Sequence, residues 1–175
     1  MTRAHSLRLT ALAGGAILAL AGLAGCALDR EAKVRAQLEQ WVELGDTTYF
    51  ESAPDCTLGV FATEATELSP KLQTVPSVRQ GLLLMGHDLA VAFAVEGQTP
   101  TLITEEVMTA DLPTGLGVLS AGIAAKNCMT PEVTRSYLSA LHSDQATLIF
   151  DPANNALAVF DRLGERIFYA RSGVI

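Results

Sequence analysis

The stretch ATLIFDPANNALAVFDRLGERIFYA, residues 146–170, decides the fold class of this chain. It contains three mostly apolar runs, over 146–150, 156–160 and 166–170, and each has the length of a buried strand. The links between them, DPANN and DRLGE, contain the Asp-Pro and Gly that are typical of turns. Because short links favour pairing between neighbours in sequence, the stretch predicts a three-stranded antiparallel meander.

Further strands are expected upstream of this meander. TTYFES (47–52) and CTLGVFAT (56–63) have the composition of strands, whereas the Pro-bounded ELSPKLQTVP (67–76) predicts a loop. LAVAFAVE (89–96) is apolar on both faces and uniformly small on one, which predicts a central strand approached closely by a helix. After a turn at GQTP, the segment TLITEEVMTA (101–110) is predicted to return as a neighbouring strand.

Helices are expected in four places between these strands, over residues 28–44, 77–86, 112–126 and 131–143. The first has apolar residues at helical spacing, namely Val34, Leu38, Trp41 and Val42, with Asp29 placed to cap it or to complement its dipole. Ser77 and Gly86 are the expected cap and end of the second helix. In the third, Gly117, Ala121 and Ala125 recur every four residues and predict a face that another backbone approaches closely.

Together these elements predict one small α+β domain with a mainly antiparallel sheet, the C-terminal meander, and helices packed on the sheet. The length of 175 residues fits a single domain, and an apolar content of 49% is enough for a packed core. The net charge is −7, and it becomes −9, from 10 basic and 19 acidic residues, without Arg3 and Arg8 near the N-terminus. Such a surface repels phosphates, so neither nucleic-acid binding nor direct adhesion to anionic lipid is expected.

The N-terminus has the three-part layout of a secretory signal. A short basic start, MTRAHSLR, precedes an apolar stretch of 17 residues, LTALAGGAILALAGLAG, which ends in small residues. This stretch is marginal for spanning a bilayer core, which requires about 20 residues. It is followed at once by Cys26, within the tetrapeptide Leu23-Ala24-Gly25-Cys26.

This tetrapeptide resembles the lipobox of bacterial lipoproteins. The resemblance implies that residues 1–25 are a cleaved signal peptide, and that the thiol and the freed amine of Cys26 are acylated with chains such as palmitate. Several acyl chains anchor a protein stably without a transmembrane helix, because each buried methylene contributes about 0.8 kcal/mol. The mature domain, residues 26–175, is then expected in the cell envelope, facing the periplasm. Ala27 is not the aspartate associated with inner-membrane retention, which favours the outer membrane.

Two cysteines remain once Cys26 is assigned to the lipid. Cys56 and Cys128 are separated by 72 positions, and export would deliver them to an oxidising compartment, so a disulfide is expected. In the chain-entropy model a loop of this length is worth roughly 4 kcal/mol. The alternative is a reactive thiol at Cys128, because Thr130 and Pro131 predict a helix N-terminus nearby, which can lower a thiol pKa.

Candidate catalytic residues are few. GLGVLS (115–120) approaches a dinucleotide-binding fingerprint but has Ser120 in place of the third glycine, and it lacks the spacing of a nucleophile elbow. His87 and His142 are the histidines of the mature chain, and no short ligand spacing around them predicts a metal site. The adjacent Glu105 and Glu106 would point to opposite faces of a strand. No cofactor, metal or catalytic residue is therefore assigned.

Three hypotheses about function remain open. The favoured one is a non-enzymatic envelope lipoprotein that binds a partner protein or supports an envelope assembly, and it predicts an exposed apolar patch. The first alternative is a small envelope enzyme, which requires His87 or His142 to share a pocket with acidic, Ser or Cys side chains. The second is a carrier of an apolar ligand, which requires an internal cavity beside the 89–96 strand.

Overall fold

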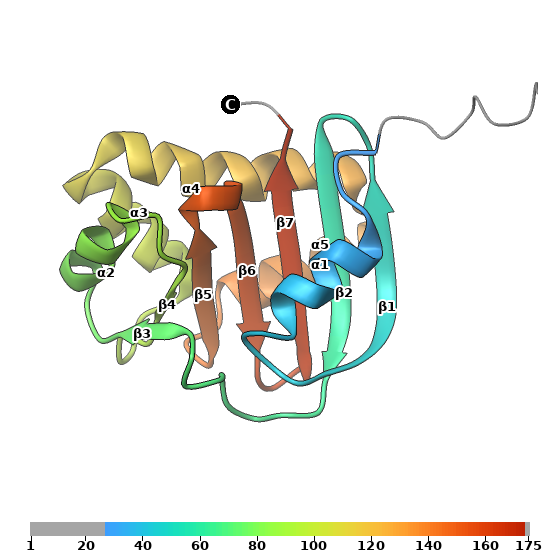
Figure 1. Ribbon diagram of the computed structural model, residues 1–175, viewed down its shortest axis with the longest axis horizontal. Helices are drawn as coiled ribbons and strands as arrows, with labels where there is room; N and C mark the ends of the chain where they lie inside the picture. The colour runs from blue at the N-terminus through green and yellow to red at the C-terminus, as the bar shows by residue number, and fades with distance from the viewer. Residues whose placement is uncertain (1–26, 174–175) are drawn as a thin grey trace, which may run out of the picture.

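The computed structural model describes residues 27–173, and within that range the chain forms one mixed seven-stranded sheet flanked by helices (Figure 1). The strands are β1 (Leu44–Ser52), β2 (Cys56–Thr63), β3 (Gln73–Val75), β4 (Val91–Phe93), β5 (Ala146–Asp151), β6 (Ala156–Asp161) and β7 (Arg166–Ser172). Their order across the sheet is β1-β2-β7-β6-β5-β4-β3. Every neighbouring pair is antiparallel except β3 and β4, which are parallel.

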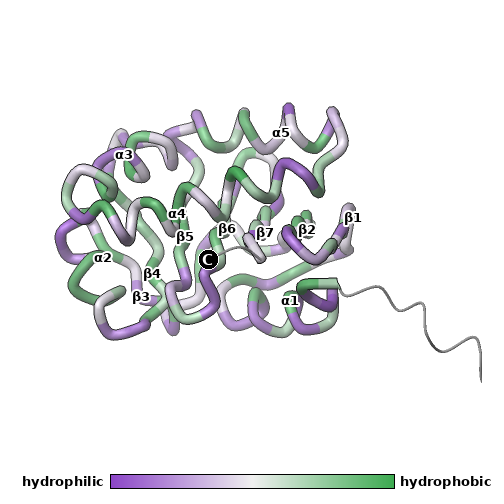
Figure 2. The backbone as a smooth tube through the Cα atoms, turned by 90° about the horizontal axis from the view of Figure 1, so that it is seen from above, coloured by the Kyte–Doolittle hydropathy of each residue, from purple (hydrophilic) through white to green (hydrophobic). Residues whose placement is uncertain are grey.

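Helices cover both faces of this sheet. They are α1 (Glu31–Leu38), α2 (Val78–Met85), α3 (Pro100–Ala110), α4 (Leu112–Ala124) and α5 (Pro131–Leu141), with short 3₁₀ turns η1 (Ala125–Cys128) and η2 (Pro152–Asn154). Seen along the strands, α1 lies on one side of the sheet and α4 and α5 lie on the other (Figure 2). The architecture is therefore a small α+β domain with three layers, as the sequence predicts.

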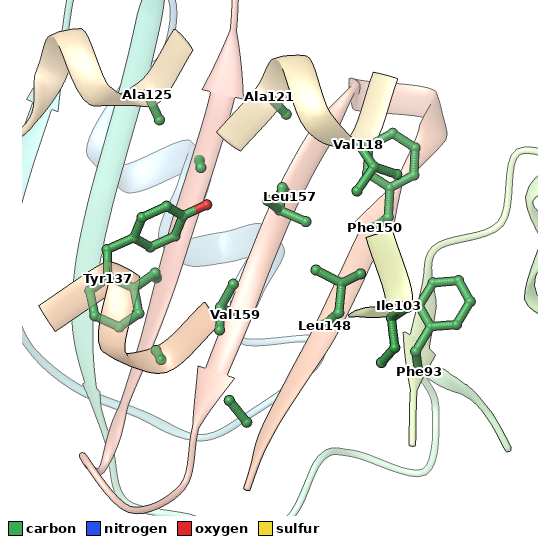
Figure 3. Close-up of a cluster of buried hydrophobic side chains, with 14 of the residues drawn as sticks. Phe93, Ile103, Val118, Ala121, Ala125, Tyr137, Leu148, Phe150, Leu157 and Val159 are labelled. Atoms are coloured by element: carbon green, nitrogen blue, oxygen red, sulfur yellow. The ribbon is translucent and has the colours of Figure 1, made fainter. Parts of the chain in front are cut away.

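The strands alternate their side chains between two apolar clusters, one on each face of the sheet. Along β7, Phe168 and Ala170 join the cluster under α2 to α5, whereas Ile167 and Tyr169 join the cluster under α1. The larger cluster includes Phe93, Ile103, Val118, Tyr137, Leu148 and Phe150, which point into the space between helices and sheet (Figure 3). Both faces of the inner strands are largely buried, which explains why their sequences are mostly apolar rather than alternating.

The C-terminal meander is confirmed. β5 pairs with β6 from Ala146 opposite Asp161, and β6 pairs with β7 from Ala156 opposite Arg171. At the first turn Asp151 caps η2, and Asn155 takes the left-handed conformation with φ of 46°. At the second turn Asp161 Oδ1 accepts from the Gly164 N–H, and Glu165 is left-handed with φ of 48°, so the links DPANN and DRLGE make the two reversals.

The segment 101–110 is a helix, and the prediction of a returning strand was wrong. The Thr99 side chain accepts a hydrogen bond from the Leu102 N–H at 3.3 Å, and Pro100 occupies the first turn of α3. Ile103 and Val107, four residues apart, are buried on the inner face of this helix. The capping threonine and the proline are standard start signals for a helix, and they override the strand propensity of the β-branched residues.

The expected central strand over 89–96 is also shorter and more peripheral than predicted. β4 contains only three residues and lies next to β3, which forms the edge of the sheet. β3 itself falls within 67–76, where a loop is predicted. The apolar pattern of 89–96 thus locates β4 but overstates its length, whereas β3, which pairs only with β4, has no strong local signal of its own.

Different turns and links lie at the two ends of the sheet. The upper end in Figure 1 contains the Ala53–Asp55 turn between β1 and β2, the η2 link, and Ser172 at the end of β7. The lower end contains the turn between β6 and β7, where Leu163 is 75% exposed. α4 crosses the upper end, since Gly117 faces Asn155 near η2 and the helix leads through η1 to Cys128, beside Cys56.

Candidate functional site

The first described residues are fixed to the upper end of the sheet. The Leu28 N–H donates a hydrogen bond to the Ala53 carbonyl at 3.0 Å, and the Asp29 N–H donates one to Ser52 Oγ at 2.9 Å. Cys26, the predicted lipidation site, lies outside the described residues. The chain is thus bound to the β1–β2 hairpin within two positions of that cysteine.

A buried ion pair strengthens this connection. Arg171 Nη1 donates to Asp29 Oδ1 at 2.7 Å, and the side chains are 24% and 2% exposed. The remaining atoms Asp29 Oδ2 and Arg171 Nε are buried without a hydrogen-bond partner within residues 27–173. Of the two roles predicted for Asp29, the cap was wrong, because Arg30 occupies the cap position of α1 without a side-chain bond. Asp29 instead joins the start of the domain to an inner strand.

The polar contacts continue beneath α1. Gln37 Nε2 donates to Asp151 Oδ2 at 2.7 Å, and this carboxylate also accepts from Asn154 Nδ2 at 2.7 Å. Burial raises the pKa of Tyr169, and the negative charge of Asp29 raises it further, against a smaller opposing effect of Arg171. These contacts hold α1 against the upper end of the sheet.

A disulfide between Cys56 at the start of β2 and Cys128 in η1 also lies at the upper end of the sheet. The two residues are 0% and 2% exposed and their Cα atoms lie 6.1 Å apart. The bond confirms the predicted pairing and leaves no free thiol at Cys128. Two further contacts support it, because the Tyr49 hydroxyl donates to the Cys128 carbonyl at 2.8 Å and Asn127 Nδ2 donates to Asp55 Oδ2 at 3.2 Å. The β1–β2 hairpin is therefore joined covalently to the helical layer.

The outer face of α4 is apolar and exposed. Leu112, Leu116 and Ile123 are 56%, 49% and 53% exposed, and we call these three residues the α4 stripe. No residue of the helix, from Leu112 to Ala124, carries a charged side chain. Five other large apolar residues of the described chain are also exposed, namely Leu83, Leu89, Leu102, Leu138 and Leu163. The upper end thus presents an uncharged apolar surface along one helix.

The sequence predicts that another backbone closely approaches α4 at the face of Gly117, Ala121 and Ala125. A close approach is present, but it is to α3 and occurs at Gly115 rather than at Gly117. A Cβ on Gly115 would collide with the backbone of Met108 in α3, whereas one on Gly117 would make ordinary contacts with the side chains of Asn155 at 3.4 Å and Phe150 at 3.6 Å. The Gly-rich segment lies inside the helix rather than between a strand and a helix, so it does not form a nucleotide-binding turn. The Ser120 hydroxyl donates to the Gly117 carbonyl at 3.0 Å.

The remaining chemical candidates are dispersed over exposed positions. His87 follows α2 and His142 ends α5, and neither side chain makes a hydrogen bond or ion pair within residues 27–173. Glu105 and Glu106 lie on α3, where Glu106 accepts a hydrogen bond from Gln98 at 3.2 Å. Within the described range, no group of three or more His, Cys, Asp or Glu side chains is arranged to hold a metal ion.

A hollow of about 420 Å³ opens at the lower part of the domain. Its walls come from the β4–α3 link, including Val95 and Gln98, and from the start of β5 at Ala146. The hollow is open to solvent, and Gln98 Oε1 is buried without a partner among the described residues. It is not the internal cavity that an apolar-ligand carrier would need.

The chain was compared with protein-family models, curated proteins and solved structures, and none of them matches it. Among residues 27–173, no helix is both long and apolar enough to cross a membrane. A function for this chain therefore has to be argued from its own residues.

Proposed function

We propose that this chain is a lipid-anchored protein of the bacterial cell envelope, whose mature domain is a non-enzymatic module that binds a partner or supports an assembly. The observation that carries this proposal is the tetrapeptide Leu23-Ala24-Gly25-Cys26 directly after a 17-residue apolar segment. Cleavage before Cys26 and acylation of its thiol and amine would leave the domain facing the periplasm. Ala27 favours the outer membrane over the inner membrane.

The short connection between Cys26 and the fold supports anchoring close to the membrane. Two residues of extended chain span at most about 7 Å, and Leu28 is already hydrogen-bonded to the β1–β2 hairpin. Asp29 then pairs with Arg171, so no flexible linker separates the lipid from the domain. A protein held in this way keeps one end at the bilayer.

The disulfide supports export of the domain. Cysteine pairs form and persist in oxidising compartments such as the periplasm and are rare in the cytosol. Cys56 and Cys128 are bonded in the folded domain, and both are buried. The pairing agrees with the compartment that the lipobox implies.

Two exposed apolar side chains far from the anchored end are available for a binding role. Leu163, in the lower turn, is 75% exposed, and Leu83 on α2 is 67% exposed. Single apolar side chains are common on protein surfaces, so these two are positions at which contact with a partner can be tested. An upper end at the membrane would leave the lower end available to another envelope protein.

Photo-crosslinking in intact cells tests this role. A photoreactive amino acid at Leu163 should give one discrete adduct with an envelope protein, and mass spectrometry should identify that protein. Glu132, an exposed residue of α5, provides a control position without an apolar side chain. The adduct should disappear when Cys26→Ser prevents anchoring. The absence of any adduct at Leu163 and at Leu83 would contradict a binding role.

A further inference from the structure

The upper end of the domain holds both the entry of the chain from Cys26 and the α4 stripe. The Ala53–Asp55 turn connects them, because Ala53 accepts from the Leu28 N–H and Asp55 accepts from Asn127, which directly follows α4 in η1. α4 extends from there across the ends of the strands (Figures 1 and 2). The surface nearest the predicted lipid therefore includes this helix.

The α4 stripe faces away from the core. Val118, Ala121 and Ala125 point from the helix toward the sheet and are at most 1% exposed (Figure 3). Leu112, Leu116 and Ile123 follow at spacings of four and seven residues, which places them together on the opposite side of the helix. A helix that is apolar on all sides is typical of an element covered on all sides. In the described chain nothing covers this face.

We propose that the α4 stripe docks on the lipid bilayer to which Cys26 is attached. This inference rests on the proposed function, because the acyl chains of Cys26 bring the bilayer to the upper end. The membrane surface is then within about 7 Å of Leu28, as two residues reach no further. Lipid attachment makes docking intramolecular, so three apolar side chains are enough for a contact that would be weak between separate molecules.

The charge distribution favours lipid contact through this helix rather than through the rest of the surface. The mature chain carries 19 acidic and 10 basic residues, and such a surface is repelled by anionic headgroups. α4 carries no charge, and Lys126 in η1 is the first charged residue after it. The stripe itself carries no carboxylate to desolvate, and the carboxylate of Asp111, beside Leu112, stays at the exposed start of the helix, where it caps α4. The contact is therefore expected with zwitterionic lipid and without dependence on salt.

Tryptophan quenching by brominated lipid tests the orientation directly. Full-length protein, processed and acylated in cells, is reconstituted into phosphatidylcholine vesicles with or without bromine on the acyl chains. Leu116→Trp places a probe on the stripe, and Leu163→Trp places one at the opposite end of the sheet. Trp41 is only 7% exposed, so its emission is subtracted with the unsubstituted protein.

An interfacial helix buries its apolar face roughly 5–10 Å into the headgroup and acyl boundary, so bromine should quench the Leu116→Trp emission roughly twofold or more. Emission from Leu163→Trp should not change. Flotation with the vesicles is recorded in the same samples, and failure to float contradicts the lipid anchor itself. If the protein floats but Leu116→Trp is not quenched, or both probes are quenched equally, docking through α4 is wrong. A protein adduct in cells from a photoreactive residue at Leu116 would likewise overturn it.

Discussion

Arg171 donates a hydrogen bond to the Asp29 carboxylate at 2.7 Å, across 142 positions of sequence. The contact joins the third residue after Cys26 to β7, which lies between β2 and β6 in the sheet. The start of the described chain is therefore tied to an inner strand of the sheet and is not a peripheral tail.

The two partners of this pair should contribute unequally to stability. Arg171→Met leaves a carboxylate that is 2% exposed without a partner, and breaking a buried pair in this way costs about 3 kcal/mol of unfolding free energy. Asp29→Asn should cost only about 1 kcal/mol, because the amide oxygen still accepts from Arg171. Urea unfolding followed by Trp41 fluorescence measures both. Arg135→Met, at an exposed ion pair with Glu132, is the control and should have almost no effect. Equal costs for the first two variants would contradict the asymmetry.

The disulfide should account for a large part of the stability. The Cys56→Ala/Cys128→Ala protein should lose roughly 4 kcal/mol, because a closed loop of 72 positions no longer restricts the unfolded chain. Unfolding in urea with and without reductant checks this value. The reductant should destabilise the unsubstituted protein and leave the double variant unchanged. Two thiols that are alkylated in the folded protein without reduction would show that the pair is not bonded.

Gly115 and Gly117 should respond to alanine with opposite signs. Gly115→Ala forces a Cβ against the Met108 backbone, and overpacking of this kind costs about 2 kcal/mol. Gly117→Ala has room beside Asn155 and should stabilise the helix by up to about 1 kcal/mol, since alanine has the higher helix propensity. Thermal unfolding of the two single variants provides the comparison. A similar melting temperature for both would mean that α3 and α4 do not approach each other as described.

Tyr137 should make the domain sensitive to alkali. Its hydroxyl is buried without a hydrogen-bond partner in the described chain, and burial raises the pKa of Tyr137 above the usual value near 10. The unfolded chain ionises first as the pH rises above about 10, so stability present below that pH is lost above it.

Removal of the Tyr137 hydroxyl should therefore reduce the stability that the domain loses at high pH. Tyr137→Phe should match or slightly exceed the stability of the unsubstituted protein at pH 7 and should exceed it by more above pH 10. Tyr49→Phe is the matched variant, because the Tyr49 hydroxyl donates to the Cys128 carbonyl and its removal should cost about 1 kcal/mol at pH 7. Urea midpoints between pH 7 and 11 check both expectations. A larger loss at pH 7 for Tyr137→Phe than for Tyr49→Phe would contradict the burial described for Tyr137.

Local signals were sufficient for the elements whose chemistry is local. The turn residues after Phe150 and Phe160 predict the meander. Ser77 predicts the start of α2, and its Oγ accepts a hydrogen bond from the Gln80 N–H at 3.4 Å. Thr99 and Pro100 carry an equally local signal for α3. The strand prediction for 101–110 was wrong because the Thr99 cap and Pro100 start a helix there.

Other features depend on partners that are distant in sequence. The Asp29–Arg171 pair has no local signature, and a capping role is the natural prediction for an acidic residue just before a helix. β3 forms only against β4, so three residues within a Pro-bounded segment cannot be identified as a strand beforehand. For α4, the small residues Ala121 and Ala125 do mark the side that faces the core. Apolar residues also lie on the other sides of the helix, so the sequence could not show that Leu112, Leu116 and Ile123 are exposed.

Metabolic labelling with radioactive palmitate tests the central claim most directly, namely that the domain is anchored through Cys26. The unsubstituted protein should incorporate label and migrate as a form shortened by removal of residues 1–25. Cys26→Ser should incorporate none and should accumulate as the unprocessed precursor. The double variant Cys56→Ala/Cys128→Ala should still be labelled, because its lipobox is intact. Unchanged labelling of Cys26→Ser, or no labelling of the unsubstituted protein, would contradict the lipid anchor.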